Sequence, residues 1–456
     1  MPVNSFENYP MSWKPKRPQG TKPIYLNIAE QLERDIKDGT ITPNTMLPPQ
    51  RELADYLDVN LSTVTRALKI CALKGLLYGV VGRGTFVSPH AAVLEPKDNA
   101  DITDLRYLET FPETSSYVGR AVTNIVNRPD FKQVMSYRNK TAEKCHIYAA
   151  KAYLSKLGLN ADTDNIILCP GSQNALSIVL FSAFRAGDKI AVDRYTYHNF
   201  KNLACRLSIQ LVSVDTDEKG MLPAALEKQC MRNGIKGIYL MPVCQNPTSV
   251  TMPSDRRKEL LTVIKRFGLT IIEDASNMFL DSSSEDSFYS LYGSTYFVMG
   301  TSKALCSGIR LAVLIYPDNA RENIETSFSC LNLKMSSLDA EIFTELVNSH
   351  AYLKIISEKK RLLEERNYIF HKYFDNYSKY ESPLSFFRWI ELPEKQNVDA
   401  FLRSCLDREV IALSSDMFCV RSENKKFIRV ALSSPDTPEK LDTSLMKLNL
   451  LLNGLN

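Results

Sequence analysis

Short apolar runs alternate with helix-like patterns through the middle of this 456-residue chain. The runs occupy positions 189–192, 237–241, 269–272 and 296–299. Strands this apolar are buried on both faces, which is typical of parallel sheets whose crossover helices cover both sides. The sequence therefore predicts an α/β domain built around a mostly parallel sheet.

Polar residues stand where strands of this sheet end, which is where ligands of such sheets bind. Gly171-Ser172-Gln173 precedes an apolar helix, so free N–H groups and the Ser172 hydroxyl can receive a phosphate. Arg310 and Ser302 add a guanidinium and a second hydroxyl for the same anion. These residues predict a phosphate site.

Further residues in this set suit an aromatic aldehyde that carries the phosphate. Lys303 follows a strand seven residues before Arg310 and supplies the amine for a Schiff base. Asp274 can pair with a ring nitrogen, Asn246 can bond a ring oxygen, and Tyr197 can stack on the ring. A strand-end Asp or a Ser-Lys pair is by itself usually structural or merely exposed. Taken together, the residues predict a site for pyridoxal phosphate.

The first part of the chain has a different pattern. Residues 1–22 are rich in proline, which predicts a mobile arm. Within residues 23–88, a first amphipathic helix is followed by a short helix at 51–57 and by a third helix capped by Asn60 or Ser62. Alternating residues with glycines after the third helix predict a two-stranded hairpin. This order is that of a winged helix-turn-helix.

The head, defined as residues 23–88, resembles the winged helix of the GntR family. The resemblance is carried by Leu47-Pro48-Pro49-Gln50-Arg51-Glu52-Leu53-Ala54, Thr63-Val64, Gly75-Leu76-Leu77 and Gly82-Arg83-Gly84-Thr85-Phe86-Val87. It implies that the third helix enters the major groove of operator DNA and that the wing tip approaches the minor groove. The residues placed near DNA are Arg51, Ser62, Thr63, Thr65, Arg66, Arg83 and Gly84.

An alternative for any one of these residues is a polar side chain that is simply solvated. Charge does not decide between the two, since residues 1–88 hold 11 Lys or Arg against 8 Asp or Glu. Leu61 also stands where the family often has an arginine, so base contacts are expected to fall to Arg66 or Arg83.

The rest of the chain resembles the fold-type I aminotransferases, in the order Gly-Ser-Gln, Tyr, Asn-Pro-Thr, Asp, Ser-Lys, Arg. A GntR head joined to such a domain resembles the MocR subfamily of bacterial transcription regulators. After a linker at 89–104, the resemblance implies an aminotransferase-like domain at 105–456. Its large part spans about 150–320, and its smaller α+β part spans about 330–456.

The same resemblance implies a head-to-tail homodimer in which each head lies over the partner's aminotransferase-like body. It also implies that Arg429 binds the carboxylate of an effector. The alternative for Arg429 is a strand residue whose charge lies in solvent.

Several positions depart from the family pattern. Ser276 faces the ring in place of a tyrosine, and Ser249 replaces a glycine. The segment 137–153 lacks the expected Gly and Arg, with His146 close to the Arg position. Cofactor retention tolerates such changes better than catalysis, which needs closer placement of reacting groups.

These observations predict a regulator that holds pyridoxal phosphate and senses it, as a B6 vitamer, or a small amino compound that reacts with it. Two rival hypotheses are a working aminotransferase with a regulatory head and a dimeric DNA-binding protein that has lost the cofactor. Turnover with amino acids would distinguish a working aminotransferase from a regulator. A visible absorbance band would distinguish a protein that holds the cofactor from one that has lost it.

Composition and sequence pattern restrict where the protein acts and whether it carries disulfides or a structural metal. No apolar run approaches the roughly 18 residues of a membrane span, and the N-terminus lacks the order of a signal peptide, so we expect a cytoplasmic protein without a membrane partner. The ten cysteines include no CxxC pair and no Cys/His cluster, which predicts reduced thiols and no structural metal.

Overall fold

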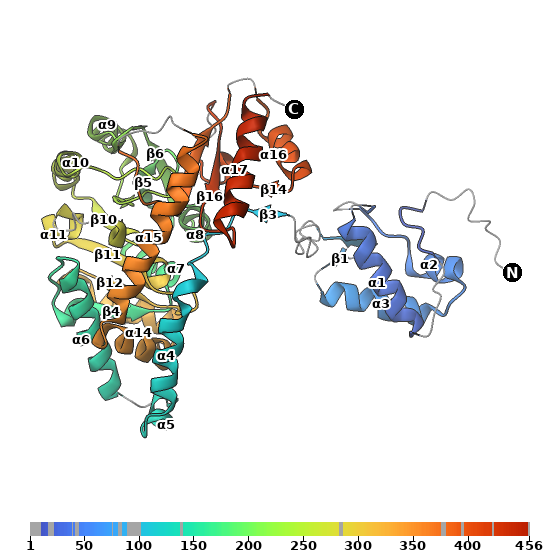
Figure 1. The fold of residues 1–456 in the computed structure, drawn as a ribbon, viewed down its shortest axis with the longest axis horizontal. Coiled ribbons are helices and arrows are strands. Elements are labelled where there is room, and N and C mark those ends of the chain that lie inside the picture. The colour runs from blue at the N-terminus through green and yellow to red at the C-terminus, as the bar shows by residue number, and fades with distance from the viewer. Residues whose placement is uncertain are drawn as a thin grey trace. The chain divides into compact units, whose positions relative to one another are not determined.

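The computed structural model consists of two compact units, Met1–Asp101 and Ile102–Asn456 (Figure 1). Each unit has its own hydrophobic core. The structure describes residues 11–16, 22–38, 40–41, 45–74, 76–80, 84–88, 102–136, 140–281, 286–374, 380–393, 396–421 and 424–454.

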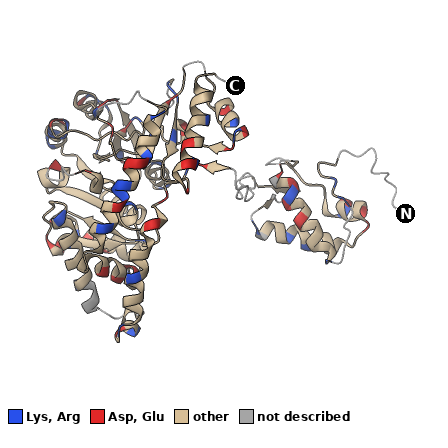
Figure 2. Ribbon diagram, viewed as in Figure 1, with Lys and Arg blue, Asp and Glu red and all other residues tan. Residues whose placement is uncertain are grey.

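The first unit contains the three helices and the hairpin that the sequence predicts. They are α1 Ile24–Lys37, α2 Gln50–Leu57, α3 Leu61–Leu73, β1 Leu77–Val80 and β2 Gly84–Val87. Val64, Leu68 and Cys71 form a buried stripe on α3 because they recur at helical spacing. Asn60 is the residue at the N-cap of α3. Basic and acidic residues are interspersed along the helices (Figure 2).

Residues 11–16 differ from the mobile arm that the sequence suggested. Trp13 is only 3% exposed and belongs to the core of the first unit. Its Nε1 donates to Asp35 Oδ2 on α1 at 2.8 Å. The prolines exclude a helix here but do not prevent an extended segment from packing an indole whose N–H finds an acceptor. Positions 1–10 and 17–21 lie outside the described residues.

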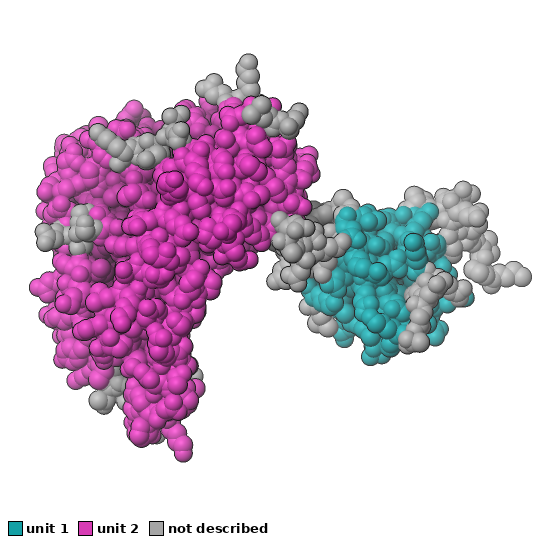
Figure 3. Space-filling model, viewed as in Figure 1, with its two compact units in different colours: residues 1–101 teal, residues 102–456 magenta. Residues whose placement is uncertain are grey.

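The second unit, which is magenta in Figure 3, contains a seven-stranded, mostly parallel sheet. Its order is β4 Ile166–Cys169, β12 Ala312–Ile315, β11 Thr295–Gly300, β10 Thr270–Asp274, β9 Gly237–Leu240, β5 Lys189–Asp193 and β6 Gln210–Val214. Only β12 runs antiparallel to its neighbours in this sheet. The four apolar runs predicted as strands are thus confirmed as β5, β9, β10 and β11.

Helices cover both faces of the sheet. Side chains alternate along β9, so Tyr239 packs with α7 Ser172–Ala183, α8 His198–Arg206 and α13 Arg321–Leu331, whereas Ile238 packs with helices on the other face. The other face holds α9 Pro223–Asn233, α10 Ser254–Phe267 and α11 Phe288–Leu291. The sheet is therefore buried on both sides, as its apolar strands require.

A further group of helices packs against β4, β12 and β11, on the same face of the sheet as α10. It consists of α4 Ser115–Val126, α5 Phe131–Val134, α6 Lys140–Lys156, α14 Ser337–Asn348 and the long α15 Ala351–His371. The short elements α12 Thr301–Ala304, β7 Thr216–Asp217 and β8 Gly220–Met221 complete this part. Together these elements form the large part of the second unit.

The smaller α+β part is built on a three-stranded antiparallel sheet in the order β13 Phe387–Glu391, β16 Phe427–Ala431 and β15 Leu413–Ser414. It is covered by α16 Val398–Asp407 and α17 Pro438–Leu452. The strand β3 Thr103–Asp104 pairs with β14 Val410–Ile411, so the end of the expected linker belongs to this folded part. Among the described residues, no helix is long and apolar enough to cross a membrane.

Candidate functional site

A cavity of about 560 Å³ lies where strands of the large sheet end and the smaller part begins. It collects nearly all residues that the sequence proposed for the cofactor and effector site. Ten of these line it: Ser172, Gln173, Tyr197, Asn246, Asp274, Ser276, Ser302, Lys303, Arg310 and Arg429. We call this space the main cavity.

One end of the main cavity is suited to an anion. Gly171 has a φ of +82°, and a Cβ placed there would lie 2.7 Å from Arg310 Nη2, so only glycine fits beside the guanidinium. Arg310 Nη1 donates to Ser302 Oγ at 3.0 Å. The N–H groups of the first turn of α7, which begins at Ser172, have no acceptor within the helix. Guanidinium, hydroxyls and helix N-terminus thus converge as a phosphate requires.

A buried carboxylate faces the centre of the main cavity. Asp274 is 3% exposed, and its Oδ2 accepts from Tyr239 Oη at 2.9 Å. Its Oδ1 accepts from Ser276 Oγ at 2.6 Å. Burial raises the pKa of Asp274, and the hydrogen bonds from Ser276 and Tyr239 oppose that rise by favouring the ionised form. These two hydrogen bonds fix the orientation of the Asp274 carboxylate at the wall of the main cavity.

Lys303 supplies an amine in a desolvated setting. Its Nζ donates to the main-chain oxygen of Leu108 at 2.6 Å, and burial lowers its pKa to about 8. The main-chain oxygen of Lys303 accepts from Lys359 Nζ on α15 at 3.0 Å. Lys359 is fully buried, and burial lowers its pKa to about 7. A lysine with a lowered pKa reacts more readily with an aldehyde because more of it is neutral.

Arg429 forms the opposite end of the main cavity. It is 3% exposed, which excludes the alternative that its charge lies in solvent. Nη1 donates to Asn246 Oδ1 at 3.1 Å, and Nη2 donates to the main-chain oxygen of Arg106 at 2.6 Å. Burial lowers the pKa of Arg429 to about 10, so it stays cationic at neutral pH. Its Nε is buried and has no partner among the described residues, which leaves a donor for a carboxylate.

Comparison with known proteins agrees with this geometry. The model "Bacterial regulatory proteins, gntR family" matches residues 24–87, and "Aminotransferase class I and II" matches residues 115–447. The chain is 35% identical to the HTH-type transcriptional regulator YdeF of Bacillus subtilis, over the full length of both. It is 22% identical to the HTH-type transcriptional regulator YjiR of Escherichia coli, covering 90% of this chain and 95% of that one.

The chain belongs to the GntR-family regulators that carry an aminotransferase class I and II domain, as in the MocR subfamily. The fold of this regulator's second unit agrees with solved aminotransferases. An archaeal alanine:glyoxylate aminotransferase superimposes with a TM-score of 0.71 at 22% identity, covering 78% of this chain and 92% of that one.

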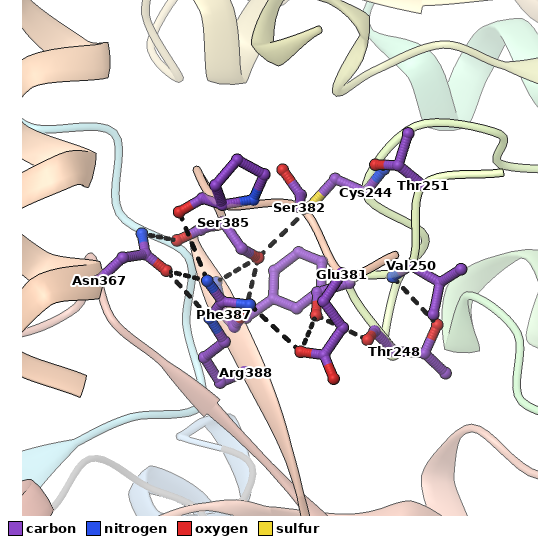
Figure 4. A network of polar contacts seen from close by, with 12 residues as sticks. Cys244, Thr248, Val250, Thr251, Asn367, Glu381, Ser382, Ser385, Phe387 and Arg388 are labelled. Atoms are coloured by element: carbon purple, nitrogen blue, oxygen red, sulfur yellow. Dashed lines mark hydrogen bonds and ion pairs between the residues drawn. The ribbon is translucent and has the colours of Figure 1, made fainter. Parts of the chain in front are cut away.

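Ser249 stands where the resemblance led us to expect glycine, and the structure shows the backbone and contacts of this residue. Ser249 has a φ of +61°, a left-handed conformation that favours glycine. Its Oγ donates to Glu381 Oε2 at 3.0 Å. Glu381 also accepts from Arg388 (Figure 4). Arg388 Nη2 donates to Asn367 Oδ1 at 2.6 Å. This buried network anchors the loop of Asn246 to the smaller part of the second unit.

Sequence reasoning missed several residues of the main cavity. Arg106, Tyr107 and Leu108 line it, although the preceding residues read as a linker. His198 lines it as well, and burial lowers the pKa of His198 to about 4, which keeps it neutral. The position of His198 directly after Tyr197 was an available signal, whereas nothing local marked residues 106–108.

The head places its predicted DNA-binding residues on one accessible surface of α3 and on α2. Ser62, Thr65 and Arg66 are exposed, and Thr63 is partly buried. The Arg66 guanidinium lies over the Tyr25 ring at 4.0 Å. Arg51 is exposed at the start of α2. Gly84 begins β2 with a φ of +121°, and Arg83 lies outside the described residues.

One further position that the sequence singled out, His146, lies away from the main cavity. His146 is buried in α6, where its Nδ1 lies 2.9 Å from Thr344 Oγ1, so it does not replace the family's arginine as a cavity residue. Among the described residues, no group of three or more His, Cys, Asp or Glu could hold a metal ion.

Proposed function

We propose that this protein is a transcription regulator that binds operator DNA through its head and holds pyridoxal phosphate in the main cavity. The observation that carries the proposal is the convergence of ten sequence-selected side chains, from Ser172 to Arg429, on one cavity. The glycines support the fit, because a Cβ at Gly300 would lie 2.1 Å from Ser172 Oγ. The anion end therefore depends on glycine at both Gly171 and Gly300.

Each residue has a role toward the cofactor. Pyridoxal phosphate supplies an electrophilic aldehyde and an electron-withdrawing ring. Lys303 would hold the aldehyde carbon, and Asp274 would keep the ring nitrogen protonated. Tyr197 would cover a ring face, and Asn246 and Ser276 would face its oxygen side. The phosphate would be held by Gly171, Ser172, Gln173, Ser302 and Arg310.

The effector we infer is a small amino compound or a B6 vitamer. Arg429 would bind the carboxylate of an amino compound, with its guanidinium already oriented by Asn246 and by the main chain of Arg106. We also infer a homodimer, because operator half-sites are read by symmetric pairs of helix-turn-helix heads. The resemblance to the MocR subfamily implies that this dimer is arranged head-to-tail. Turnover is not expected, since Ser276 cannot reach as far as the family's tyrosine.

The direct test is spectroscopic. Purified protein incubated with pyridoxal phosphate should show a visible absorbance band that borohydride removes, and peptide mapping should find the reduced adduct on Lys303. Lys303→Ala should abolish the band, whereas Lys258→Ala, on the exposed surface of α10, should retain it. An adduct on another lysine would refute the site.

A second measurement separates a regulator from an enzyme. An amino acid and a keto acid should give at most one half-reaction per chain, while footprinting should show sequence-specific protection of operator DNA. Steady multiple turnover would instead favour a working aminotransferase with a DNA-binding head. Absence of any cofactor band would favour a regulator that has lost the cofactor.

A further inference from the structure

A second cavity, of about 270 Å³, adjoins the main cavity. Ser307 lines both spaces, and Thr110 Oγ1 donates to Ser307 Oγ at 3.0 Å on the shared wall. Arg366 on α15 lines the second cavity, seven residues after Lys359, which holds the main chain of Lys303. The two cavities are therefore connected by a common loop and a common helix.

Two deeply buried polar groups in the wall of the second cavity lack partners. Arg366 is 2% exposed, and its Nη1 donates to the main-chain oxygens of Leu432 and Pro435, but its Nε has no acceptor among the described residues. Ser433 is 3% exposed, and its Oγ has no partner among them either. Because burying an unpaired donor costs free energy, two such groups around one space indicate a ligand that carries acceptor oxygens.

The charges around the second cavity restrict that ligand. Arg366 is a cation in its wall, while Glu109, Glu113 and Asp436 also line it with carboxylates. Glu113 and Asp436 lie close enough to Arg366 to interact with its charge. A dianion such as phosphate would be repelled by three carboxylates. A molecule with one carboxylate and one ammonium group complements both signs.

We propose that the second cavity binds a small zwitterionic amino acid. Its carboxylate accepts from Arg366 Nε and Ser433 Oγ, and its ammonium group faces Glu113 and Asp436. The volume of about 270 Å³ is far above the roughly 10–15 Å³ that one water needs, so an amino acid with a short side chain has room there. This site is separate from the carboxylate-binding role proposed for Arg429.

Calorimetry with L-alanine as the probe tests the proposal on the full chain. The Arg429→Leu protein removes both the charge and the guanidinium fork of the main cavity, and saturable binding of one alanine per chain should remain. Adding Ser433→Ala should weaken that binding about tenfold, the usual effect of losing a hydrogen bond to a charged group. Ser433→Ala should still fold, because the hydroxyl has no partner to lose within the part of the chain that the structure describes.

The matched control is Ser444→Ala. Ser444 is an equally buried serine on α17, but its Oγ donates within the helix to the main-chain oxygen of Lys440. Alanine affinity should be unchanged in this variant. No saturable binding, or equal affinity in Ser433→Ala and Ser444→Ala proteins, would overturn the site and leave only water in the cavity.

Analogues test the charge pattern. Propionate lacks the ammonium group and ethylamine lacks the carboxylate, so each should bind at least about tenfold more weakly than alanine. Inorganic phosphate should bind more weakly still. Glu113→Gln should weaken the binding of alanine but not the binding of propionate. If propionate binds as tightly as alanine, the zwitterion assignment is wrong even though a carboxylate site exists.

Discussion

The two ends of the main cavity are built differently. The cofactor end draws its side chains from the ends of strands of one sheet: Ser172 follows β4, Asp274 ends β10, and Arg310 precedes β12. The effector end joins Arg429 to Asn246 across 183 residues and to the main chain of Arg106 across 323 residues. Local motifs therefore specify the cofactor end, whereas long-range packing specifies the effector end. If this division holds, substitutions at the two ends should affect different ligands.

The largest effect is expected at the anion end. Arg310→Gln removes a cationic donor from the phosphate and should lower affinity for pyridoxal phosphate by about 10-fold to 150-fold, from roughly 1.5–3 kcal/mol for a hydrogen bond between charged groups. Equilibrium dialysis against the free cofactor measures this change. Arg321→Gln, on the exposed start of α13, serves as a control and should bind normally. Equal losses of cofactor affinity in both variants would show that any loss of positive charge weakens binding, wherever it lies.

A second prediction uses the amine at the cofactor end. Burial lowers the pKa of Lys303 from 10.5 to about 8, and only the neutral amine attacks an aldehyde. The neutral fraction is about one tenth at pH 7 and about nine tenths at pH 9. Stopped-flow absorbance should therefore show attachment accelerating about tenfold between these pH values, then levelling off. A rate that still rises tenfold per pH unit above 9 would indicate an ordinary lysine.

The difference between the two ends explains what the sequence could predict. Periodicity located the strands and their polar ends because each depends on neighbouring residues, so Gly171, Asp274 and Lys303 could be placed by position alone. Arg106 could not, because its position depends on β3 pairing with β14, about 300 residues later in the chain. In the first unit, Trp13 was missed for the same reason. Its burial depends on contact with Asp35 and not on a local pattern.

The effector end offers a third prediction. Arg429→Lys keeps the charge but loses the guanidinium fork that Asn246 and Arg106 orient. It should therefore lower the affinity for carboxylate-bearing amino compounds about tenfold. Cofactor affinity should change far less, which is the opposite of the Arg310 result. Titration of the visible band with amino acids measures the affinity for amino compounds, and titration with pyridoxal phosphate measures the affinity for the cofactor. If Arg429→Lys lowered the affinities for cofactor and amino compound to the same extent, the cofactor end and the effector end would act as one unit.

The smallest effect is expected on operator DNA, because it requires coupling between the main cavity and the head. A ligand can shift the DNA-binding equilibrium only by its differential affinity for the two conformations, and typical couplings of about 1–3 kcal/mol correspond to about 5-fold to 150-fold. We expect the lower end of this range, so cofactor-loaded protein and Lys303→Ala protein should differ in operator affinity about fivefold. Fluorescence anisotropy measures the difference. The salt and protein concentrations must be matched, because phosphate contacts make operator affinity strongly salt-dependent.

Arg66→Ala is the control, since it should weaken operator binding equally with and without cofactor. Identical binding curves for loaded and Lys303→Ala protein would show that the cofactor end stabilises the fold without reaching the DNA.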